Sequence, residues 1–226
     1  MPVSRRLGLL AGALALLLGA CAYQGPESQS NLVTQRATWF SYLASDDIRA
    51  ACAAGAPERY RLVYNADFNR QVRAYDVVRE PGSWVLRQAI DRGVVFDGHL
   101  SGLSSLGAPR TAESRLTDAE MAELTARLED AGAFGPPDAG LTLGAQDYYW
   151  LASGCHDGEF FLTGWRHPGT DIASLPFVPF IASHDSTGVP FPPIRPGDRS
   201  CTRGLSDRDD VICFSVRIGQ DGLAGY

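Results

Sequence analysis

The chain has 226 residues and a formal net charge of −6 at neutral pH, and all 20 of its basic residues are arginines. The absence of lysine excludes the phosphate-binding P-loop, the pyridoxal Schiff base and the SxxK centre of penicillin-recognising enzymes, because each of them needs a lysine side chain. The acidic balance argues against electrostatic binding of nucleic acid or of anionic lipid.

Residues 1–20 have the architecture of an export signal. A short basic start with Arg5 and Arg6 precedes the uncharged apolar run Leu7–Ala20. This run is shorter than the ~20 apolar residues that a membrane-spanning helix needs, and it ends at a cysteine instead of a basic stop. We therefore expect a cleavable signal peptide, whose removal makes the net charge two units more negative.

The apolar run closes with Leu18-Gly19-Ala20-Cys21, which resembles the lipobox of bacterial lipoprotein precursors. A branched apolar residue stands three positions before the cysteine and small residues stand just before it, although Gly19 departs from the usual Ala or Ser. The resemblance implies that Cys21 becomes the first mature residue and carries a diacylglyceryl thioether, with palmitate as a typical acyl chain. An amide-linked third chain is also expected, and more than one chain makes anchoring stable.

The alternative is an ordinary secretory signal that is cleaved after Ala20 and leaves Cys21 as a free thiol. An odd exposed cysteine at a secreted N-terminus would itself need an explanation, so the lipobox interpretation is favoured. The resemblance implies a lipid-anchored protein of the cell envelope that faces the periplasm. Ala22 follows the cysteine in place of aspartate, which implies the outer membrane in bacteria that sort lipoproteins.

The chain after the signal divides into a tether and a domain. Residues 21–30 are polar and contain Gly and Pro, and we interpret them as the lipidated tether. Residues 31–226 are long enough for one large domain or two small ones, and they contain no internal repeat and no clear boundary. We therefore predict a single α+β domain.

The domain is expected to begin with two helices. The pattern over Asn31–Leu43 predicts the first helix, and Ser45 is the expected cap of a second, short helix that ends at Gly55. Trp39 and Phe40 in the first helix could contact lipid headgroups, but a place in the protein core is favoured.

Short segments rich in valine and aromatic residues follow, separated by turn residues. This pattern is typical of a meander of antiparallel strands. The predicted strands are Tyr60–Tyr64, Gln71–Val78, Ser83–Ile90 and Val94–Asp97.

A helix and a hairpin are predicted in the second half. Thr117–Glu120 is a capping box, and apolar residues then recur at helical spacing until Gly132. Asp147–Ala152 and Glu159–Trp165 flank the turn signature Gly154–Gly158, which predicts a β-hairpin. The expected fold is thus a mainly antiparallel sheet with one packed long helix, N-terminal helices and two disulfides.

The last third of the chain is expected to be mostly irregular. Pro168–Pro196 is rich in proline and phenylalanine, so we predict extended segments on the surface there. Asp210–Ile218 is predicted to be the last strand.

Four cysteines remain besides Cys21. An even count outside the cytoplasm favours two disulfides, and none of the spacings matches the CxxC-like pairs of structural zinc sites. Of three possible connectivities we favour Cys52 with Cys155 and Cys201 with Cys213.

The sequence gives only weak signals for catalytic residues. Two of the four histidines, at 99, 156, 167 and 184, occur in the dipeptides His156-Asp157 and His184-Asp185, which could form a metal site or a hydrolytic dyad. No HExxH-like spacing accompanies them, so turn residues are the favoured interpretation. We assign no catalytic residue, metal ligand or cofactor from the sequence.

Two further motifs are discounted. Gly102–Gly107 resembles a GxSxG nucleophile elbow, but Leu106 stands where glycine is needed. Asp185–Gly188 resembles the DTG or DSG of aspartic proteases, but it has one residue too many and a single copy.

Alternating charges in the meander favour a solvated face. Acidic and basic residues there are expected to pair with one another, and an alternative is that arginines and tyrosines bind a carboxylated sugar or peptide. The residues are Asp67, Asp76, Glu80, Arg61, Arg73, Arg79, Tyr64 and Tyr75.

Two classes of function remain. The sequence favours a non-catalytic envelope protein that binds or assembles an envelope protein partner, and the proline-rich segment could present strands for edge pairing. The alternative is an envelope hydrolase with a His/Asp pair at its centre, which needs His156 or His184 to share a cleft with another polar group. Binding of a small ligand on the open face of the sheet lies between the two.

Overall fold

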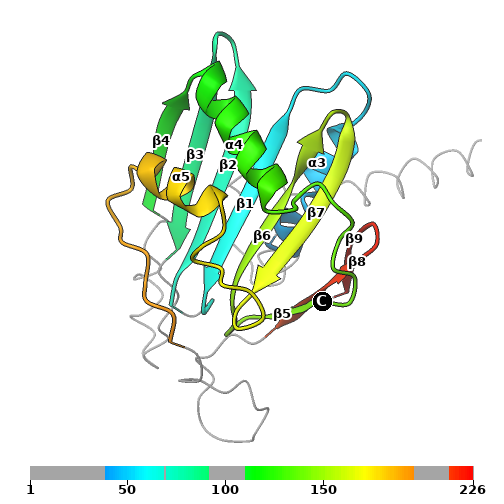
Figure 1. The fold of residues 1–226 in the computed structure, drawn as a ribbon, viewed down its shortest axis with the longest axis vertical. Coiled ribbons are helices and arrows are strands. Elements are labelled where there is room, and N and C mark those ends of the chain that lie inside the picture. Colours follow the sequence, from blue (N-terminus) through cyan, green and yellow to red (C-terminus); the bar gives the residue numbers. More distant parts are fainter. Residues whose placement is uncertain (1–38, 69, 92–109, 196–213, 226) are drawn as a thin grey trace, which may run out of the picture.

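The computed structural model describes residues 39–68, 70–91, 110–195 and 214–225. These residues form two antiparallel sheets and short helices, which confirms the predicted α+β class (Figure 1). The larger sheet contains, in spatial order, β4 (Arg110–Leu116), β3 (Ser83–Asp91), β2 (Val72–Glu80), β1 (Arg59–Ala66), β6 (Tyr148–His156) and β7 (Glu159–Arg166). The smaller sheet contains β5 (Thr142–Gly144), β8 (Ser215–Gly219) and β9 (Gly222–Gly225), again in spatial order.

The predicted meander is confirmed in β1, β2 and β3. Gly82 forms the turn between β2 and β3 with a positive φ of 85°, a conformation that glycine adopts without strain. Strand β1 lies in the middle, where Leu62 pairs with Tyr75 of β2 on one side and with Ala152 of β6 on the other. The fourth predicted strand, Val94–Asp97, lies outside the described residues.

The predicted hairpin is β6–β7. Its turn residues Asp157 and Gly158 both have positive φ, 51° and 80°, which is the backbone of a type I′ turn. A Cβ on Gly158 would lie 2.8 Å from the backbone oxygen of Ala53, so the turn packs closely against the segment that follows α3 (Asp46–Ala51). The hairpin tip is thereby fixed to the N-terminal part of the domain.

The long helix predicted from the capping box is α4 (Asp118–Asp130). The Thr117 side chain accepts a hydrogen bond from the Glu120 N–H, and the Glu120 carboxylate accepts one from the Thr117 N–H, so both halves of the box form. Gly132 follows the helix with a φ of 78° and lets the chain turn away. The buried apolar residues of the helix are Met121, Leu124 and Leu128.

A second helix, α5 (Phe177–His184), lies on the same face of the sheet as α4 (Figure 1). It corrects the prediction of extended surface segments over residues 168–196. Pro176 and Pro179 stand at the N-cap and in the first turn, where N–H groups have no partner within the helix, so neither proline breaks it. Burial of an apolar side drives its formation. The buried residues are Phe177, Phe180 and Ile181.

The helical residues 39–44, α3 and the small sheet cover the opposite face of β1, β6 and β7. The Trp39 ring lies 5.5 Å from that of Phe68, and the Phe40 ring lies 5.4 Å from that of Phe214. Both aromatic residues thus pack against the hydrophobic core on this face of the sheet, as favoured from the sequence. Residues 31–38 of the predicted first helix lie outside the described part of the chain.

The second predicted helix, α3, is shorter than expected. It ends at Ala51, because Cys52 has an extended backbone that directs the chain out of the helix four residues before Gly55. Ser45 occupies the N-cap position but its side chain caps nothing. Its Oγ lies 2.6 Å from the Oγ of Ser153 in β6, so Ser45 ties the helix to the sheet instead.

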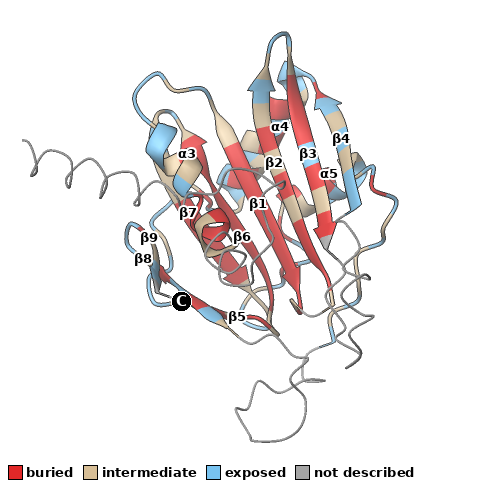
Figure 2. Ribbon diagram, turned by 180° about the vertical axis from the view of Figure 1, so that it is seen from behind, coloured by how far each residue is buried: buried red, intermediate tan, exposed pale blue. Residues whose placement is uncertain are grey.

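Strands β4, β5 and β9 were not predicted. β4 forms an edge of the large sheet and exposes Thr111, Glu113 and Arg115 at alternate positions, so it lacks the apolar signature of a buried strand. Seen from behind, β1 and β6 are buried along most of their length while β4 is largely exposed (Figure 2). The predicted strand Asp210–Ile218 is described only from residue 214, and β8 accounts for its end.

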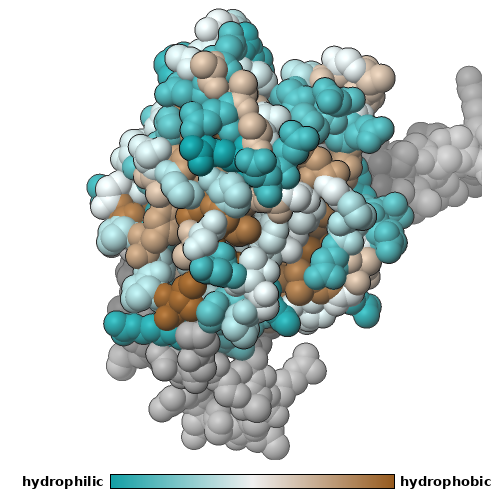
Figure 3. All heavy atoms as spheres, in the orientation of Figure 1, coloured by the Kyte–Doolittle hydropathy of each residue, from teal (hydrophilic) through white to brown (hydrophobic). Residues whose placement is uncertain are grey.

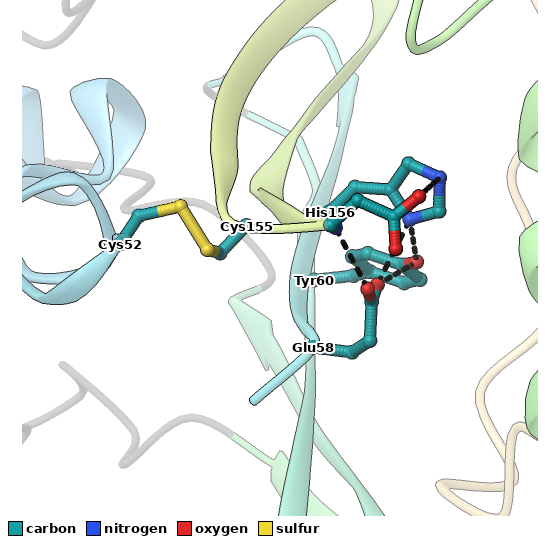
Figure 4. Close-up of a disulfide and its surroundings, with 6 residues drawn as sticks. Cys52, Glu58, Tyr60, Cys155 and His156 are labelled. Carbon is teal, nitrogen blue, oxygen red and sulfur yellow. Dashed lines mark hydrogen bonds and ion pairs between the residues drawn. A yellow bond between two sulfur atoms is a disulfide. The ribbon is translucent and has the colours of Figure 1, made fainter. Parts of the chain in front are cut away.

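A disulfide joins Cys52, at the end of α3, to Cys155 in β6 (Figure 4). This is the pairing favoured from the sequence. It closes a loop with a sequence separation of 103 residues. Cys21, Cys201 and Cys213 lie outside the described residues. No helix in the described ranges is long and apolar enough to span a bilayer.

Candidate functional site

His156 is the last residue of β6, and sheet register brings it beside the start of β1. Tyr60 in β1 pairs with Gly154, so Glu58, two residues earlier, lies next to His156 (Figure 4). Side chains alternate between the faces of a strand. The Cys155 side chain therefore points away from His156, and the disulfide lies on the other face of the sheet.

The imidazole ring of His156 is held on several sides. Its Nδ1 lies 3.0 Å from Glu58 Oε2 and 3.0 Å from the Tyr60 hydroxyl. The Tyr60 hydroxyl also donates to Glu58, and the backbone N–H of Asp157 donates to Glu58 Oε1 at 2.9 Å. The Phe134 ring stacks on the imidazole with a centroid distance of 4.0 Å. We refer to these five residues as the His156 centre.

The protonation of the centre follows from these contacts. Burial raises the pKa of Glu58, but hydrogen bonds from Asp157, Tyr60 and His156 outweigh it and hold that pKa below its usual value. Burial and the Glu58 carboxylate raise the pKa of Tyr60, so the phenol stays protonated. Because Tyr60 gives its proton to Glu58, we assign the imidazole proton to Nδ1, which leaves Nε2 as the lone-pair nitrogen. Nε2 lies 3.7 Å from Asp157 Oδ2.

A groove of about 470 Å³ opens beside the His156 centre. Three parts of the chain enclose it: the loop after α4, the β6–β7 hairpin and the turn between β8 and β9. Arg49 of α3 lies at its edge, with its guanidinium 4.3 Å from the centroid of the Phe160 ring. The lining residues are Arg49, Phe134, Gly135, Pro137, His156, Asp157, Glu159, Phe160, Phe161, Leu162, Gln220, Asp221 and Gly222.

The composition of the groove limits its chemistry. In the part of the chain that the structure describes, no serine, threonine or cysteine lines it. The groove does offer an oriented imidazole, apolar aromatic rings and several carboxylates. This combination suits ligand or cation binding.

The second His-Asp dipeptide lies in a different environment. His184 ends α5, where its Nδ1 lies 2.9 Å from the Phe180 carbonyl oxygen and its Nε2 lies 3.3 Å from Glu120 Oε1. Asp185 turns instead toward Arg73. His184 therefore contacts the start of α4 and shares no described groove with the His156 centre.

Asp185 has a structural role in the Asp185–Gly188 segment. Its Oδ1 accepts a hydrogen bond of 2.9 Å from the Thr187 N–H, which makes an Asx turn. Its Oδ2 lies 2.6 Å from Nη1 of Arg73, and both side chains are buried. The resemblance to an aspartic protease motif thus has no catalytic meaning here. The other discounted motif, Gly102–Gly107, and His99 lie outside the described residues.

The expectation of a solvated charged face is wrong for its central arginines. Arg61 is 1% exposed and bonds to Asp76 at 2.7 Å and to Asp47 of α3 at 2.9 Å. Arg73 is fully buried and pairs with Asp185 rather than with a strand neighbour. Sequence alternation misses this arrangement because both faces of the sheet are covered by helices and loops.

The tyrosines of the meander are also buried, and its remaining charged residues form ion pairs. Tyr64 and Tyr75 are buried, so the face proposed for a carboxylated ligand is closed. Arg79 pairs with Asp118, Asp67 with Arg70, and Glu80 with Arg87.

Sequence reasoning singled out His156 and Asp157 but missed Glu58, Tyr60 and Phe134. His156 is the end of a strand and Asp157 a turn residue, so the turn interpretation holds for the aspartate alone. Glu58 is 98 positions away in the chain. Only the pairing of β1 with the predicted hairpin brings the two together.

Comparisons with protein-family models, with curated proteins and with solved structures found no match.

Proposed function

We propose that this chain is the precursor of a lipid-anchored envelope protein, whose domain faces the periplasm and binds an envelope partner or ligand without catalysis. The Cys52–Cys155 disulfide carries the proposal, because stable disulfides form outside the cytoplasm. It agrees with the export signal and with the lipobox resemblance that ends at Cys21. Lipid attachment would hold the domain at the membrane through a short tether.

The groove beside the His156 centre is the proposed binding surface. It combines aromatic rings with polar side chains, as ligand sites commonly do. The described face that carries α4 and α5 shows hydrophobic residues in small patches separated by hydrophilic ones (Figure 3). Such a face offers no broad apolar area for a partner.

Edge pairing through the proline-rich segment loses its support. α5 folds onto the sheet, and Arg73 binds the carbonyl oxygens of Val189 and Pro190 at 2.6 Å each. These two carbonyl oxygens are therefore not free to pair with another strand.

An envelope hydrolase is the second candidate. The Glu58–His156 hydrogen bond favours it, because a carboxylate that orients an imidazole is a common arrangement of a general base. Without a hydroxyl or thiol among the described lining residues, such an enzyme would need water as the attacking group.

Membrane fractionation tests the anchor. The wild-type protein should sediment with envelope membranes, and Cys21→Ser should not be lipidated. Equal partitioning of the two proteins would contradict lipid anchoring. His156→Gln separates binding from hydrolysis: turnover of an envelope polymer by the wild type that is lost in this variant would contradict the non-catalytic assignment.

A further inference from the structure

Three potential metal ligands converge at the His156 centre. Glu58, His156 and Asp157 each offer one ligand atom, and these atoms lie within 4.8 Å of one another. One imidazole and two carboxylates are suitable ligands for zinc and related divalent ions. We propose that these three residues bind a divalent transition-metal ion at the edge of the groove.

The separations are close to those of a metal site. Zinc binds nitrogen and oxygen at ~2.0–2.1 Å, so adjacent ligands of a tetrahedral ion lie about 3.3 Å apart. Only one ring nitrogen of His156 can bind the ion. Nδ1 lies 3.0 Å from Glu58 Oε2, so an ion there would replace the proton between them, and the neutral ring would carry its proton on Nε2. Asp157 Oδ2 lies 3.7 Å from Nε2, and its side chain would have to rotate toward Nδ1 to complete the three ligands.

The three metal-binding side chains differ in how far they are exposed and therefore in how freely they can move. The side chains of Glu58 and His156 are only 28% and 27% exposed, and the centre holds both in place. The Asp157 side chain is 87% exposed, so it can rotate onto an ion without disturbing the core. Two of the three metal-binding side chains are thus held in place before the ion binds, and the mobile carboxylate of Asp157 completes the site.

Neighbouring groups act as the outer partners that metal sites use to orient their ligands. Tyr60 and the Asp157 N–H donate to the Glu58 carboxylate, and Phe134 stacks on the imidazole. The disulfide of the preceding residue, Cys155, fixes the end of β6.

The charge of the groove favours a cation. Its lining includes the acidic residues Asp157, Glu159 and Asp221, against a single arginine, Arg49, whose guanidinium lies over Phe160. Acidic walls raise the local concentration of cations. Three protein ligands leave a fourth position open toward the groove, where a water or a ligand group can bind the ion.

The inference does not depend on the lipid anchor, since it concerns only side chains of the folded domain. It deepens the proposed binding role by giving the groove a metal through which an anionic or carbonyl group could be held. Failure of the metal test leaves the anchor intact, and an unlipidated protein could still bind the ion.

Calorimetric titration with Zn²⁺ tests the proposed metal site. The protein is purified from cells, treated with EDTA to remove bound metal, dialysed and kept non-reduced. One ion per chain should bind to the wild type. His156→Gln and Asp157→Asn should each weaken binding by at least ~10- to 100-fold, the range known for lost supporting groups of metal sites. Asparagine tolerates the positive φ of position 157, so that variant keeps the turn.

His184→Gln is the matched control, because His184 also lies beside a carboxylate, that of Glu120. It should bind like the wild type. Circular dichroism verifies that each variant is folded, and Co²⁺ should give visible absorption bands in the wild type that Asp157→Asn reduces. Absence of binding to the wild type, or equal affinity in the wild type and Asp157→Asn, would overturn the site.

Discussion

Arg73 should be among the most costly residues of the sheet to replace. All five of its N–H donors have acceptors: Gln71, Tyr75, Asp185 and the carbonyl oxygens of Val189 and Pro190. Its guanidinium also lies 3.9 Å from the centroid of the Phe191 ring. Arg73→Met keeps the volume but leaves the buried Asp185 carboxylate without its cation.

The expected loss in the free energy of unfolding is about 3 to 5 kcal/mol, the range for removing one partner of a buried ion pair. Arg79→Met is the matched control, because it places the same substitution on the same strand. The Arg79 side chain is 40% exposed and its partner Asp118 is 81% exposed. An exposed pair of this kind contributes less than about 1 kcal/mol.

Urea denaturation followed by circular dichroism measures both variants under non-reducing conditions. Arg73→Met should lower the midpoint far more than Arg79→Met, with no change in the slope. If the two variants lose the same stability, or if Arg73→Met loses under about 1 kcal/mol, the buried network does not hold the segment after α5 to the sheet.

Three other predictions concern stability and are measured by the same denaturation assay. Replacing both Cys52 and Cys155 by serine should cost about 3 to 5 kcal/mol, because the disulfide spans 103 residues, and a loss below about 1 kcal/mol would contradict this. Thr117→Ala should cost about 1 kcal/mol through loss of the α4 cap, whereas an unchanged midpoint would show that the box contributes nothing. Despite burial, hydrogen bonds and arginine neighbours hold the pKa values of Asp47 and Asp185 below their ordinary 3.8 in the folded state. Their contribution is therefore complete above about pH 4 and should be lost as the pH falls below 3.8, so a midpoint that stays constant down to pH 2 would refute it.

Local signals predicted those elements whose causes lie close together in the sequence. The capping box of α4 depends on Thr117 and Glu120, three residues apart, and the hairpin turn depends on Asp157 and Gly158. The meander strands follow from their alternating apolar residues and from the turn at Gly82. In each case the pattern and the structure that it forms lie within one short segment.

Other elements depend on contacts that the sequence does not display. α5 forms in a proline-rich stretch because its apolar side is buried on the sheet, and β4 carries too few apolar residues to be recognised as a strand. Arg73 looks like a surface residue until α5 and the segment after it cover the sheet. Tertiary burial overrides the local pattern in all three.

The candidate site could be predicted only in part for the same reason. His156 and Asp157 stood out as a dipeptide, but a metal site or a general base is defined by its partners. Glu58 comes from the residue just before β1 and Phe134 from the loop after α4. The absence of an HExxH-like spacing therefore said little about ligands that come from separate elements.

The most direct measurement of the central claim is the intact mass of the protein purified from membranes, wild type beside Cys21→Ser, without reduction. We expect a wild-type mass that lacks residues 1–20 and exceeds that of the mature polypeptide by a lipid-sized increment, which disappears in the variant. We also expect cysteines that resist alkylation until they are reduced, in keeping with the Cys52–Cys155 disulfide. An unlipidated wild-type mass, or one that retains residues 1–20, would contradict the proposal of a lipid-anchored envelope protein.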